Sequence, residues 1–379
     1  RSNTMRTQTD DSPFMTRPDT DDFASLFTQG VALLDVRAPV EFEQGAFPSA
    51  TNLPLMNDQE RHQVGLRYKQ VNQEAAIKLG HELVSGDIKA ARVALWKAFA
   101  QAHPEGYLYC FRGGLRSRIS QSWLAEAGIQ YPRILGGYKA MRTFLLESLN
   151  RHIETSHFVL VSGLTGSGKT EVIQALSSTV DLEKLAHHRG SSFGKHATDQ
   201  PVQINFDNSL AIALLRLHAR GQSRIALEDE SRMIGRCALP ISLREKMQAS
   251  SVVWLEEPME IRVERILHDY VEDLGAQFAA KLGAEAGFDA FSVRLLESLQ
   301  NLIKRLGGER HTRLAAAMQA ALDEQKSAGT LDLHREWIRP LLSEYYDPMY
   351  EHQRESKRSR VIFSGDRAAV TEYLLQKGF

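Results

Sequence analysis

Short apolar runs alternate with longer amphipathic stretches along the first 150 residues. The runs at Leu33–Val36, Thr51–Leu53, Tyr107–Tyr109 and Arg133–Leu135 predict strands. Helical patterns separate them, and the polar, amphipathic stretch 57–102 is expected to be mostly helix. Alternation of this kind is typical of a parallel sheet with helices on its faces.

A second pattern of the same kind begins at His157. Strands are predicted at Phe158–Ser162, Arg224–Leu227, Ser251–Leu255 and Val361–Phe363. Between about residues 261 and 346, apolar residues recur at three- and four-residue spacings, which indicates helix. The change of pattern near 151–156 is not a flexible linker. We therefore predict two α/β domains, 14–150 and 151–379, and the second carries the helical part as an insertion or C-terminal extension.

A glycine-rich segment, Gly163–Thr170, fits the pattern G-x-x-x-x-G-K-[ST] and lies between a predicted strand and a predicted helix. Its backbone N–H groups can turn toward phosphate oxygens, and the helix N-terminus adds partial positive charge. Lys169 is expected to reach the terminal phosphates, and Thr170 is a candidate Mg²⁺ ligand. The second domain is thus predicted to be P-loop NTPase-like, and the motif indicates a phosphate-bearing ligand without specifying ATP. The residues predicted to contact it are Gly163, Gly166, Ser167, Gly168, Lys169 and Thr170.

Three acidic residues follow the predicted strand at 224–227. A carboxylate at this strand end would face Thr170 and could hold the metal through water. Glu228, Asp229 and Glu230 compete for that role, and the sequence does not choose among them. Asp229 is kept as the candidate beside Thr170, although a solvated acidic strand end is the competing interpretation.

Two arginines lie beyond the next strand. The segment Trp254–Pro258, followed by Glu264 and Arg265, resembles the lid-proximal region of small P-loop kinases, where arginines meet phosphate; Arg262 lies on the same stretch. Arg265 is therefore a candidate phosphate ligand. Exposed helix salt bridges explain both arginines about as well.

A cysteine ends the strand predicted at 107–109. Cys110 is followed by Gly113 and Gly114 and then by a helix predicted to begin near residue 117. In such a loop the backbone N–H groups and the helix dipole converge on one point, where a thiolate is stabilised and becomes more nucleophilic. Arg116 can close this anion cradle with its two-pronged guanidinium, and Arg112 adds charge. The alternative is a buried, inert cysteine, which is the interpretation we favour for Cys237.

The segment from Leu33 to Pro54 resembles the signature of the rhodanese (sulfurtransferase) family, and the likeness covers the whole first domain. It implies that Cys110 carries a chalcogen as a persulfide or its selenium counterpart. Five residues separate Cys110 from Arg116, whereas single-domain rhodaneses usually have four. Five is the spacing of related phosphatase loops, so the bound anion is expected to be phosphate-like, such as a phosphorylated chalcogen donor.

The pairing of a rhodanese-like domain with a P-loop domain resembles the tRNA 2-selenouridine synthase family over nearly the whole chain. The segments that carry this likeness are Cys110–Ser117, Gly163–Thr170, Leu185–Gly194, Glu228–Gly235 and Tyr345–Tyr350.

The resemblance implies a two-step exchange at the wobble uridine of tRNA. Geranyl diphosphate first alkylates the sulfur of 2-thiouridine, and selenium from selenophosphate then displaces the geranylated sulfur. Cys110 would be essential for selenation, and the P-loop would bind the geranyl diphosphate. The segment Leu185–Gly194 looks like a substrate loop, with Arg189 as a candidate ligand.

The same resemblance implies an anticodon loop carrying 2-thiouridine as partner, and an enzyme that produces selenophosphate. Composition does not add support for a tRNA partner. The chain has 46 Lys and Arg against 47 Asp and Glu, so it has no global positive field. Basic runs at 354–360 and 304–313 could follow phosphates, and Tyr345, Tyr346 and Tyr350 could stack an unpaired base or belong to the core.

The compartment is predicted from what the sequence lacks. Two distant cysteines build no disulfide framework, no apolar run is long enough to cross a membrane, and the N-terminus does not read as a secretory signal. A cytoplasmic enzyme that makes no membrane contact is expected.

Three other functions fit parts of this pattern. The chain could be an ATP-dependent tRNA sulfurtransferase in which Cys110 carries a persulfide. It could be a phosphatase–kinase fusion, although no Asp or Glu follows Cys110 before Glu126 to act as general acid. It could also be a chalcogen carrier or tRNA-binding adaptor that performs no chemistry.

Overall fold

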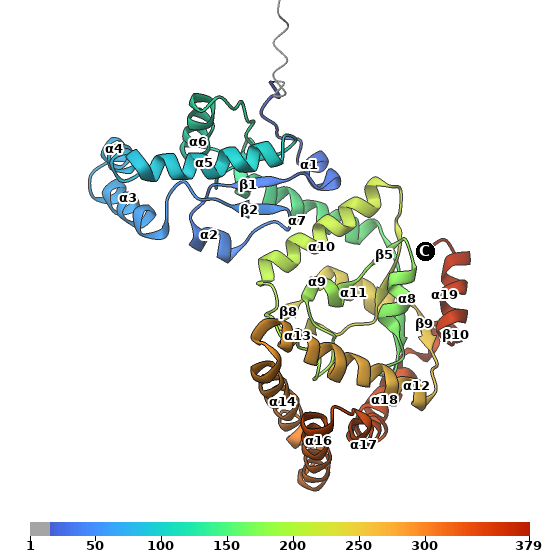
Figure 1. Ribbon diagram of the computed structural model, residues 1–379. Coiled ribbons are helices and arrows are strands. Elements are labelled where there is room, and N and C mark those ends of the chain that lie inside the picture. The colour runs from blue at the N-terminus through green and yellow to red at the C-terminus, as the bar shows by residue number, and fades with distance from the viewer. Residues whose placement is uncertain (1–15) are drawn as a thin grey trace, which may run out of the picture. The chain divides into compact units, whose positions relative to one another are not determined.

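The computed structural model describes residues 16–379, which form two compact units that divide between Ser148 and Leu149 (Figure 1). The division falls inside helix α7 (Gly137–Thr155), and the domain boundary predicted at 150/151 lies in the same helix. Residues 14 and 15, with which the first predicted domain begins, lie outside the described part.

The N-terminal unit is built on three short parallel strands. Their order in the sheet is β2 (Ala50–Asn52), β1 (Leu33–Asp35) and β3 (Tyr107–Tyr109). The fourth predicted strand, Arg133–Leu135, is not a strand, because it forms only isolated bridges to Leu108 and Thr20. Two glycines with positive φ angles follow directly and turn the chain into α7. The other helices of this unit are α1 (Phe23–Gln29), α2 (Pro39–Gln44), α3 (Asp58–Gln70), α4 (Gln73–Leu83), α5 (Gly86–Ala102) and α6 (Leu115–Glu126).

Two tryptophans organise the core of this unit on one side of the sheet. Trp96 from α5 is fully buried, stacks on Trp123 from α6 with ring centroids 6.2 Å apart, and donates to the carbonyl of Leu53 at 2.8 Å. At the end of β1, Arg37 and Asp35 form a buried ion pair at 2.7 Å. Because Arg37 also donates to the carbonyl of Gly45, which directly follows α2, this pair holds the C-terminal end of α2 against the end of β1.

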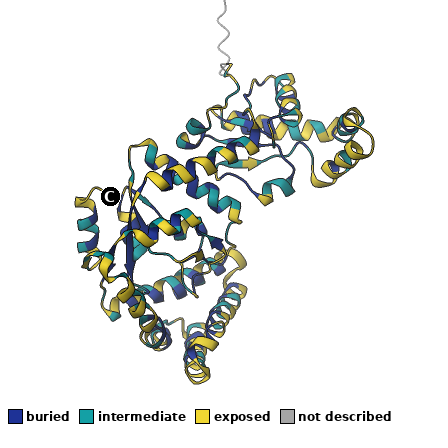
Figure 2. Ribbon diagram, turned by 180° about the vertical axis from the view of Figure 1, so that it is seen from behind, coloured by how far each residue is buried: buried dark blue, intermediate teal, exposed yellow. Residues whose placement is uncertain are grey.

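The C-terminal unit contains a five-stranded parallel sheet. The strand order is β10 (Val361–Gly365), β9 (Ser251–Leu255), β4 (His157–Gly163), β6 (Arg224–Glu228) and β5 (Thr179–Val180). All four strands predicted here are present, and Figure 2 shows β4, β6 and β9 among the buried parts of this unit, whereas β10 is not buried. Strand β5 and the antiparallel hairpin of β7 (Met233–Ile234) and β8 (Cys237–Ala238) were not predicted from the sequence. Two parallel sheets flanked by helices confirm the predicted α/β class.

Helices surround this sheet. The part of the chain that connects β9 to β10 forms a cluster of helices with its own hydrophobic core. The predicted helical stretch, about 261–346, is confirmed, with two π-helical turns at His268–Asp273 and Leu341–Tyr346. Its core includes Phe291, Leu295 and Trp337, all fully buried. Among the described residues, no helix is long and apolar enough to cross a membrane. The α-helices of the unit are α8 (Lys169–Ala175), α9 (Leu182–Ala186), α10 (Gln203–Ala219), α11 (Ile241–Ala249), α12 (Met259–Leu267), α13 (Leu274–Leu282), α14 (Ala284–Gln300), α15 (Ile303–Leu306), α16 (Gly308–Ala328), α17 (Arg335–Pro340), α18 (Asp347–Lys357) and α19 (Arg367–Gln376).

Candidate functional site

The predicted phosphate loop connects β4 to α8. Gly166 and Gly168 have φ angles of 80° and 90°, which side chains other than glycine rarely adopt, and α8 begins directly at Lys169. The hydroxyl of Ser167 is buried and has no hydrogen-bond partner among the residues that the structure describes. A buried donor without a partner is costly, so this hydroxyl fits a ligand oxygen in the loop.

Carboxylates surround the basic end of this loop. Burial alone would lower the pKa of Lys169, but Tyr350, Glu183 and Glu230 raise it above its usual value. Lys169 therefore stays cationic at neutral pH. Burial and proximity to Glu183 raise the pKa of Glu228 and Glu230 well above the usual range, so these carboxylates hold protons more tightly than exposed ones.

The carboxylates that face Thr170 differ from the one predicted. The Thr170 hydroxyl donates to Glu183 at 3.2 Å and to Glu228 at 3.3 Å. Asp229 instead accepts from Ser162 at 2.7 Å and pairs with Lys357 at 2.5 Å. Glu228 is the last residue of β6, and neighbouring residues of a strand point to opposite faces, so only one of them can meet Thr170.

The residues present fit a Mg²⁺ ion that is completed by a ligand. The described residues contain no group of three or more His, Cys, Asp or Glu side chains arranged to hold a metal. Protein sites commonly hold Mg²⁺ through one or two oxygen ligands, with substrate phosphates and water in the other positions. Thr170 and Glu228 supply oxygens of that kind, whereas Asp229 is occupied by Lys357.

Two arginines from α12 hold the phosphate loop in place. Arg265 donates to the carbonyl of Gly166 at 2.7 Å and to Glu171 at 2.8 Å, and a Cβ on Gly168 would lie 3.0 Å from its guanidinium. Arg265 thus lies on the loop, as predicted. Arg262 is 3% exposed rather than exposed on the helix, and it donates to the carbonyl of Thr165.

The partner of Arg262 comes from a distant segment. Asp347, the first residue of α18, accepts from both terminal nitrogens of Arg262, at 2.5 and 3.0 Å. Sequence analysis missed this role of Asp347, which lies inside the segment 345–350 that contributed to the family resemblance. No local pattern connects two residues that are 85 positions apart.

The segment 185–194 lies against the carboxylates of Glu183 and Glu230, which are close to Lys169 of the phosphate loop. A Cβ on Gly190 would collide with the carboxylates of Glu183 and Glu230. Arg189 pairs with Asp273 through one terminal nitrogen, while its other terminal nitrogen, Nη1, is buried and lacks a partner within the described residues. This nitrogen is the second unsatisfied polar group in the region, and it fits an anionic ligand.

The histidines of this segment have structural partners. Burial lowers the pKa of His188 to about 4, and its Nδ1 accepts from the backbone of Gly190 at 3.1 Å. His187 stacks on His196 with ring centroids 4.3 Å apart. We therefore assign these rings to holding the segment in shape, because a neutral, buried His188 adds no charge for a phosphate.

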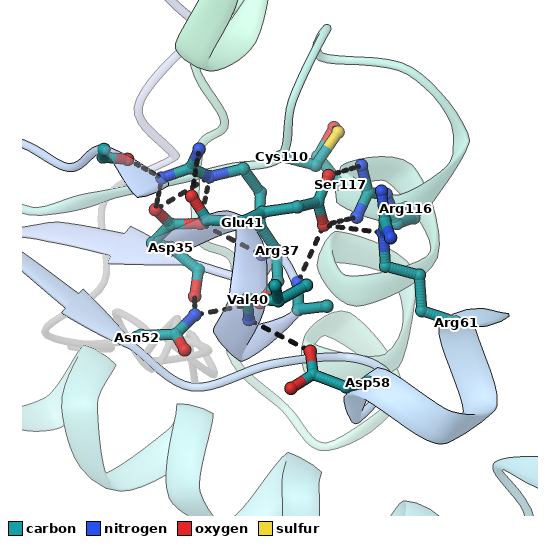
Figure 3. Close-up of polar contacts among 12 residues, drawn as sticks. Asp35, Arg37, Val40, Glu41, Asn52, Asp58, Arg61, Cys110, Arg116 and Ser117 are labelled. Carbon is teal, nitrogen blue, oxygen red and sulfur yellow. Dashed lines mark hydrogen bonds and ion pairs between the residues drawn. The ribbon is translucent and has the colours of Figure 1, made fainter. Parts of the chain in front are cut away.

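In the N-terminal unit, Cys110 follows β3 as predicted. The chain from Cys110 to Gly114 turns closely against the start of α7: a Cβ on Gly113 would lie 2.7 Å from the backbone nitrogen of Gly136. Cys110 is 3% exposed, and its thiol donates to the Ser117 hydroxyl at 3.3 Å (Figure 3). Helix α6 begins at Leu115, two residues before the predicted start, so its N-terminal N–H groups lie close to the loop.

Arg116 is already paired in this structure. Its guanidinium donates to both carboxylate oxygens of Glu41, at 2.6 and 3.1 Å, and Arg61 contacts the same carboxylate at 3.2 Å (Figure 3). Burial alone would lower the pKa of Arg116, but Glu41 raises it, and proximity to Cys110 adds to that rise. Arg116 thus lies close to the sulfur with its orientation set by Glu41, a residue that sequence analysis did not identify. Arg112 lies near the ring of Phe111, 5.8 Å from its centroid.

Replacing Glu41 by Gln is expected to destabilise the protein by about 1–2 kcal/mol at neutral pH, because Arg116 loses its charged partner. Burial tends to raise the pKa of Glu41, but Arg116 holds it below its ordinary value of 4.5. The contribution is therefore present above about pH 4.5 and is lost as the pH falls through the lower, folded-state pKa. Urea unfolding between pH 3 and 7 measures this difference.

The matched control is Glu43→Gln, since Glu43 is an exposed carboxylate of the same helix. It should leave the free energy of unfolding nearly unchanged at every pH. A Glu41→Gln effect that stayed constant down to pH 3 would contradict the assigned ion pair.

Several of the residues predicted for tRNA contact are buried or have partners in the protein. Tyr345 and Tyr346 are 9% and 2% exposed, so they belong to the helical core and cannot stack a base in this conformation. In the basic run 354–360, Arg354 pairs with Glu256 and Lys357 pairs with Asp229. Cys237 is buried as expected, and burial raises the pKa of its thiol.

Strand order, phosphate loop and anchoring arginines define the C-terminal unit as a P-loop α/β domain, joined to a second α/β unit that carries a cysteine loop. Residues 156–378 match the family model described as "tRNA 2-selenouridine synthase AAA domain". The chain belongs to the tRNA 2-selenouridine synthase family.

Relatives cover almost the full length of the chain. A protein of Bordetella bronchiseptica named tRNA 2-selenouridine synthase is 59% identical over 363 residues, which is 96% of this chain and 99% of that protein. A protein of Azotobacter vinelandii with the same name is 60% identical over 359 residues, 94% of this chain and 97% of that protein. Membership therefore rests on both units and not on the P-loop domain alone.

Proposed function

We propose that this protein converts 2-thiouridine at the wobble position of tRNA into 2-selenouridine, in two steps that use different loops. Its relatives are named for this product. The observation that carries the division into steps is the presence of two separate anion-type loops, one with Lys169 and one with Cys110, in one chain.

In the first step, the sulfur of 2-thiouridine attacks the first carbon of geranyl diphosphate. A carbon–sulfur bond forms, the carbon–oxygen bond breaks, diphosphate leaves, and N3 of the base releases its proton. The P-loop suits this leaving group, because its backbone N–H groups and Lys169 stabilise the charge that develops on the departing oxygens. The unsatisfied Ser167 hydroxyl and Arg189 nitrogen support an anion at this place. Mg²⁺, when bound at Thr170 and Glu228, would supply further charge neutralisation.

In the second step, selenium from selenophosphate attacks C2 of the S-geranylated uridine. A carbon–selenium bond forms, the geranylated sulfur leaves as a thiol, and water cleaves the phosphorus–selenium bond. Alkylation makes this exchange feasible, because a thiol is a far better leaving group than a thiocarbonyl sulfur. The Cys110 loop is the proposed site of selenophosphate, with the N-terminus of α6 facing its charge. The donor itself comes from an enzyme that makes selenophosphate.

Nucleoside mass spectrometry of 2-thiouridine tRNA tests the proposal. Purified protein receives geranyl diphosphate and selenophosphate separately and together, without ATP. The expected results are S-geranyl-2-thiouridine with the first donor alone and 2-selenouridine only with both. If the nucleoside changes only when ATP is added, the ATP-dependent sulfurtransferase becomes the better account and the geranyl route is wrong.

A further inference from the structure

A hollow in the N-terminal unit lies among α3, α4 and α6, beside the cysteine loop. Its volume is about 560 Å³, within the range of about 300–1,000 Å³ that small-molecule sites have. The walls are mainly apolar, and three of the large hydrophobic side chains there, Leu66, Tyr68 and Leu115, are more than 40% exposed. Exposed apolar surface gathered in a hollow is typical of a ligand site.

The pocket is connected to the cysteine loop through the first turn of α6. Leu115 and Arg116, which follow the loop directly, both line it, and the next residue, Ser117, accepts the hydrogen bond of the Cys110 thiol. The proposed site of selenium attack therefore lies next to an apolar cavity. Neither the P-loop nor the family model, which starts at residue 156, involves this region.

The cations that line the pocket are Arg61, Lys69 and Arg116, and none of the described residues that line it is Asp or Glu. Glu41, which lies outside this lining, pairs with both arginines, whereas Lys69 does not share its charge with that carboxylate. An apolar pocket with cationic groups suits a ligand with a hydrocarbon part and a polyanionic part. A purely apolar ligand would not interact with the cations. A bare phosphate would not contact the apolar wall.

We infer that this pocket holds the geranyl chain of the S-geranylated tRNA base while selenium attacks C2 at the Cys110 loop. The inference rests on the proposed function, in which that chain is the one hydrocarbon group present at the selenation step. Lys69 then faces the phosphates that flank the base, while Arg61 and Arg116 stay with Glu41. Holding the chain also places its sulfur, the leaving group, close to the loop and keeps C2 in line for attack. Free geranyl diphosphate contains the same chain, but the proposal assigns it to the P-loop.

The test uses the full-length protein with two variants of the pocket wall. Ile77→Trp fills the cavity from α4, and Leu66→Asp places a charge on its wall at a position that is 41% exposed and so tolerates a polar residue. Leu95→Trp is the matched control, because Leu95 is 54% exposed on α5 and does not line the pocket. Substrates are oligonucleotides that carry S-geranyl- or S-methyl-2-thiouridine, with selenophosphate as donor.

Wild type and Leu95→Trp should use the geranyl substrate with a kcat/KM at least about tenfold above that of the methyl substrate. Both pocket variants should lose that preference while they still geranylate 2-thiouridine tRNA normally, which also shows that they fold. Titration of the intrinsic tryptophan fluorescence, to which Trp123 in the pocket wall contributes, with the S-geranyl nucleoside should show binding to the wild type and not to Leu66→Asp.

Three results would overturn the inference. If the wild type does not selenate the geranyl substrate at all, the proposed function fails, and the inference fails with it. If the wild type does so and the pocket variants keep the preference, the pocket assignment alone is wrong. The pocket variants could also lose geranylation by free geranyl diphosphate and keep the preference for the S-geranyl over the S-methyl substrate. The pocket would then be assigned to the geranyl donor instead.

Discussion

Replacing Cys110 by Ala is expected to abolish the formation of 2-selenouridine and to leave S-geranylation of 2-thiouridine tRNA intact. The loss in selenation should be on the order of a thousandfold or more, as for the removal of a group on which a chemical step depends. The expectation follows from the family resemblance, which implies that Cys110 is essential for selenation. It also follows from location, because the thiol lies at the end of β3, hydrogen-bonded to Ser117 at the first turn of α6, where backbone donors favour the selenophosphate anion. Geranylation uses the other loop.

The measurement is nucleoside mass spectrometry with both donors present. In the Cys110→Ala protein, S-geranyl-2-thiouridine should accumulate because the second step no longer consumes it. Cys237→Ala is the matched control, since Cys237 is also buried but belongs to the β7–β8 hairpin. A normal yield of 2-selenouridine from the Cys110 variant would remove the cysteine loop from the mechanism.

The phosphate loop was predictable from sequence because its chemistry is local. Eight consecutive residues contain the glycines, the lysine and the hydroxyl, and they need only a strand before them and a helix after them. The cysteine loop was predictable for the same reason. In both cases the functional groups and the backbone that presents them come from one short segment.

The groups that orient these loops were not predictable, because they come from distant positions. Arg116 was identified, but its partner Glu41 lies 75 residues earlier, and nothing near Cys110 indicates it. The choice among Glu228, Asp229 and Glu230 failed for a different reason. It depends on the register of β6 against β4, where Glu228 lies opposite Val161, and a run of acidic residues does not reveal that register.

Short strands are also difficult to predict from the sequence. The segment Arg133–Leu135 has the apolar pattern of a strand, and Ile134 does donate to the carbonyl of Leu108 at 2.8 Å. Two glycines end the extended conformation immediately, so no ladder forms. The β7–β8 hairpin was missed because each of its strands has only two residues, too few for an alternating pattern.

Replacing Lys169 by Ala is expected to lower the rate of S-geranylation by a factor on the order of 10²–10³, the usual effect of removing one group that stabilises developing negative charge. Lys169 acts as a fixed charge and not as a base, because its pKa is raised and it remains protonated at neutral pH. Diphosphate departure would then lack its nearest cation. The rate is measured with 2-thiouridine tRNA and geranyl diphosphate alone.

The variant should keep its activity in the second step. Given an oligonucleotide that already carries S-geranyl-2-thiouridine, Lys169→Ala should form 2-selenouridine at nearly the wild-type rate, which separates a lost chemical group from a lost fold. Lys184→Ala is the matched control, since Lys184 is an exposed lysine of α9 beside Glu183 and should change neither step. Equal losses in both steps would mean that the two reactions share the P-loop, and the division of labour between the loops would be wrong.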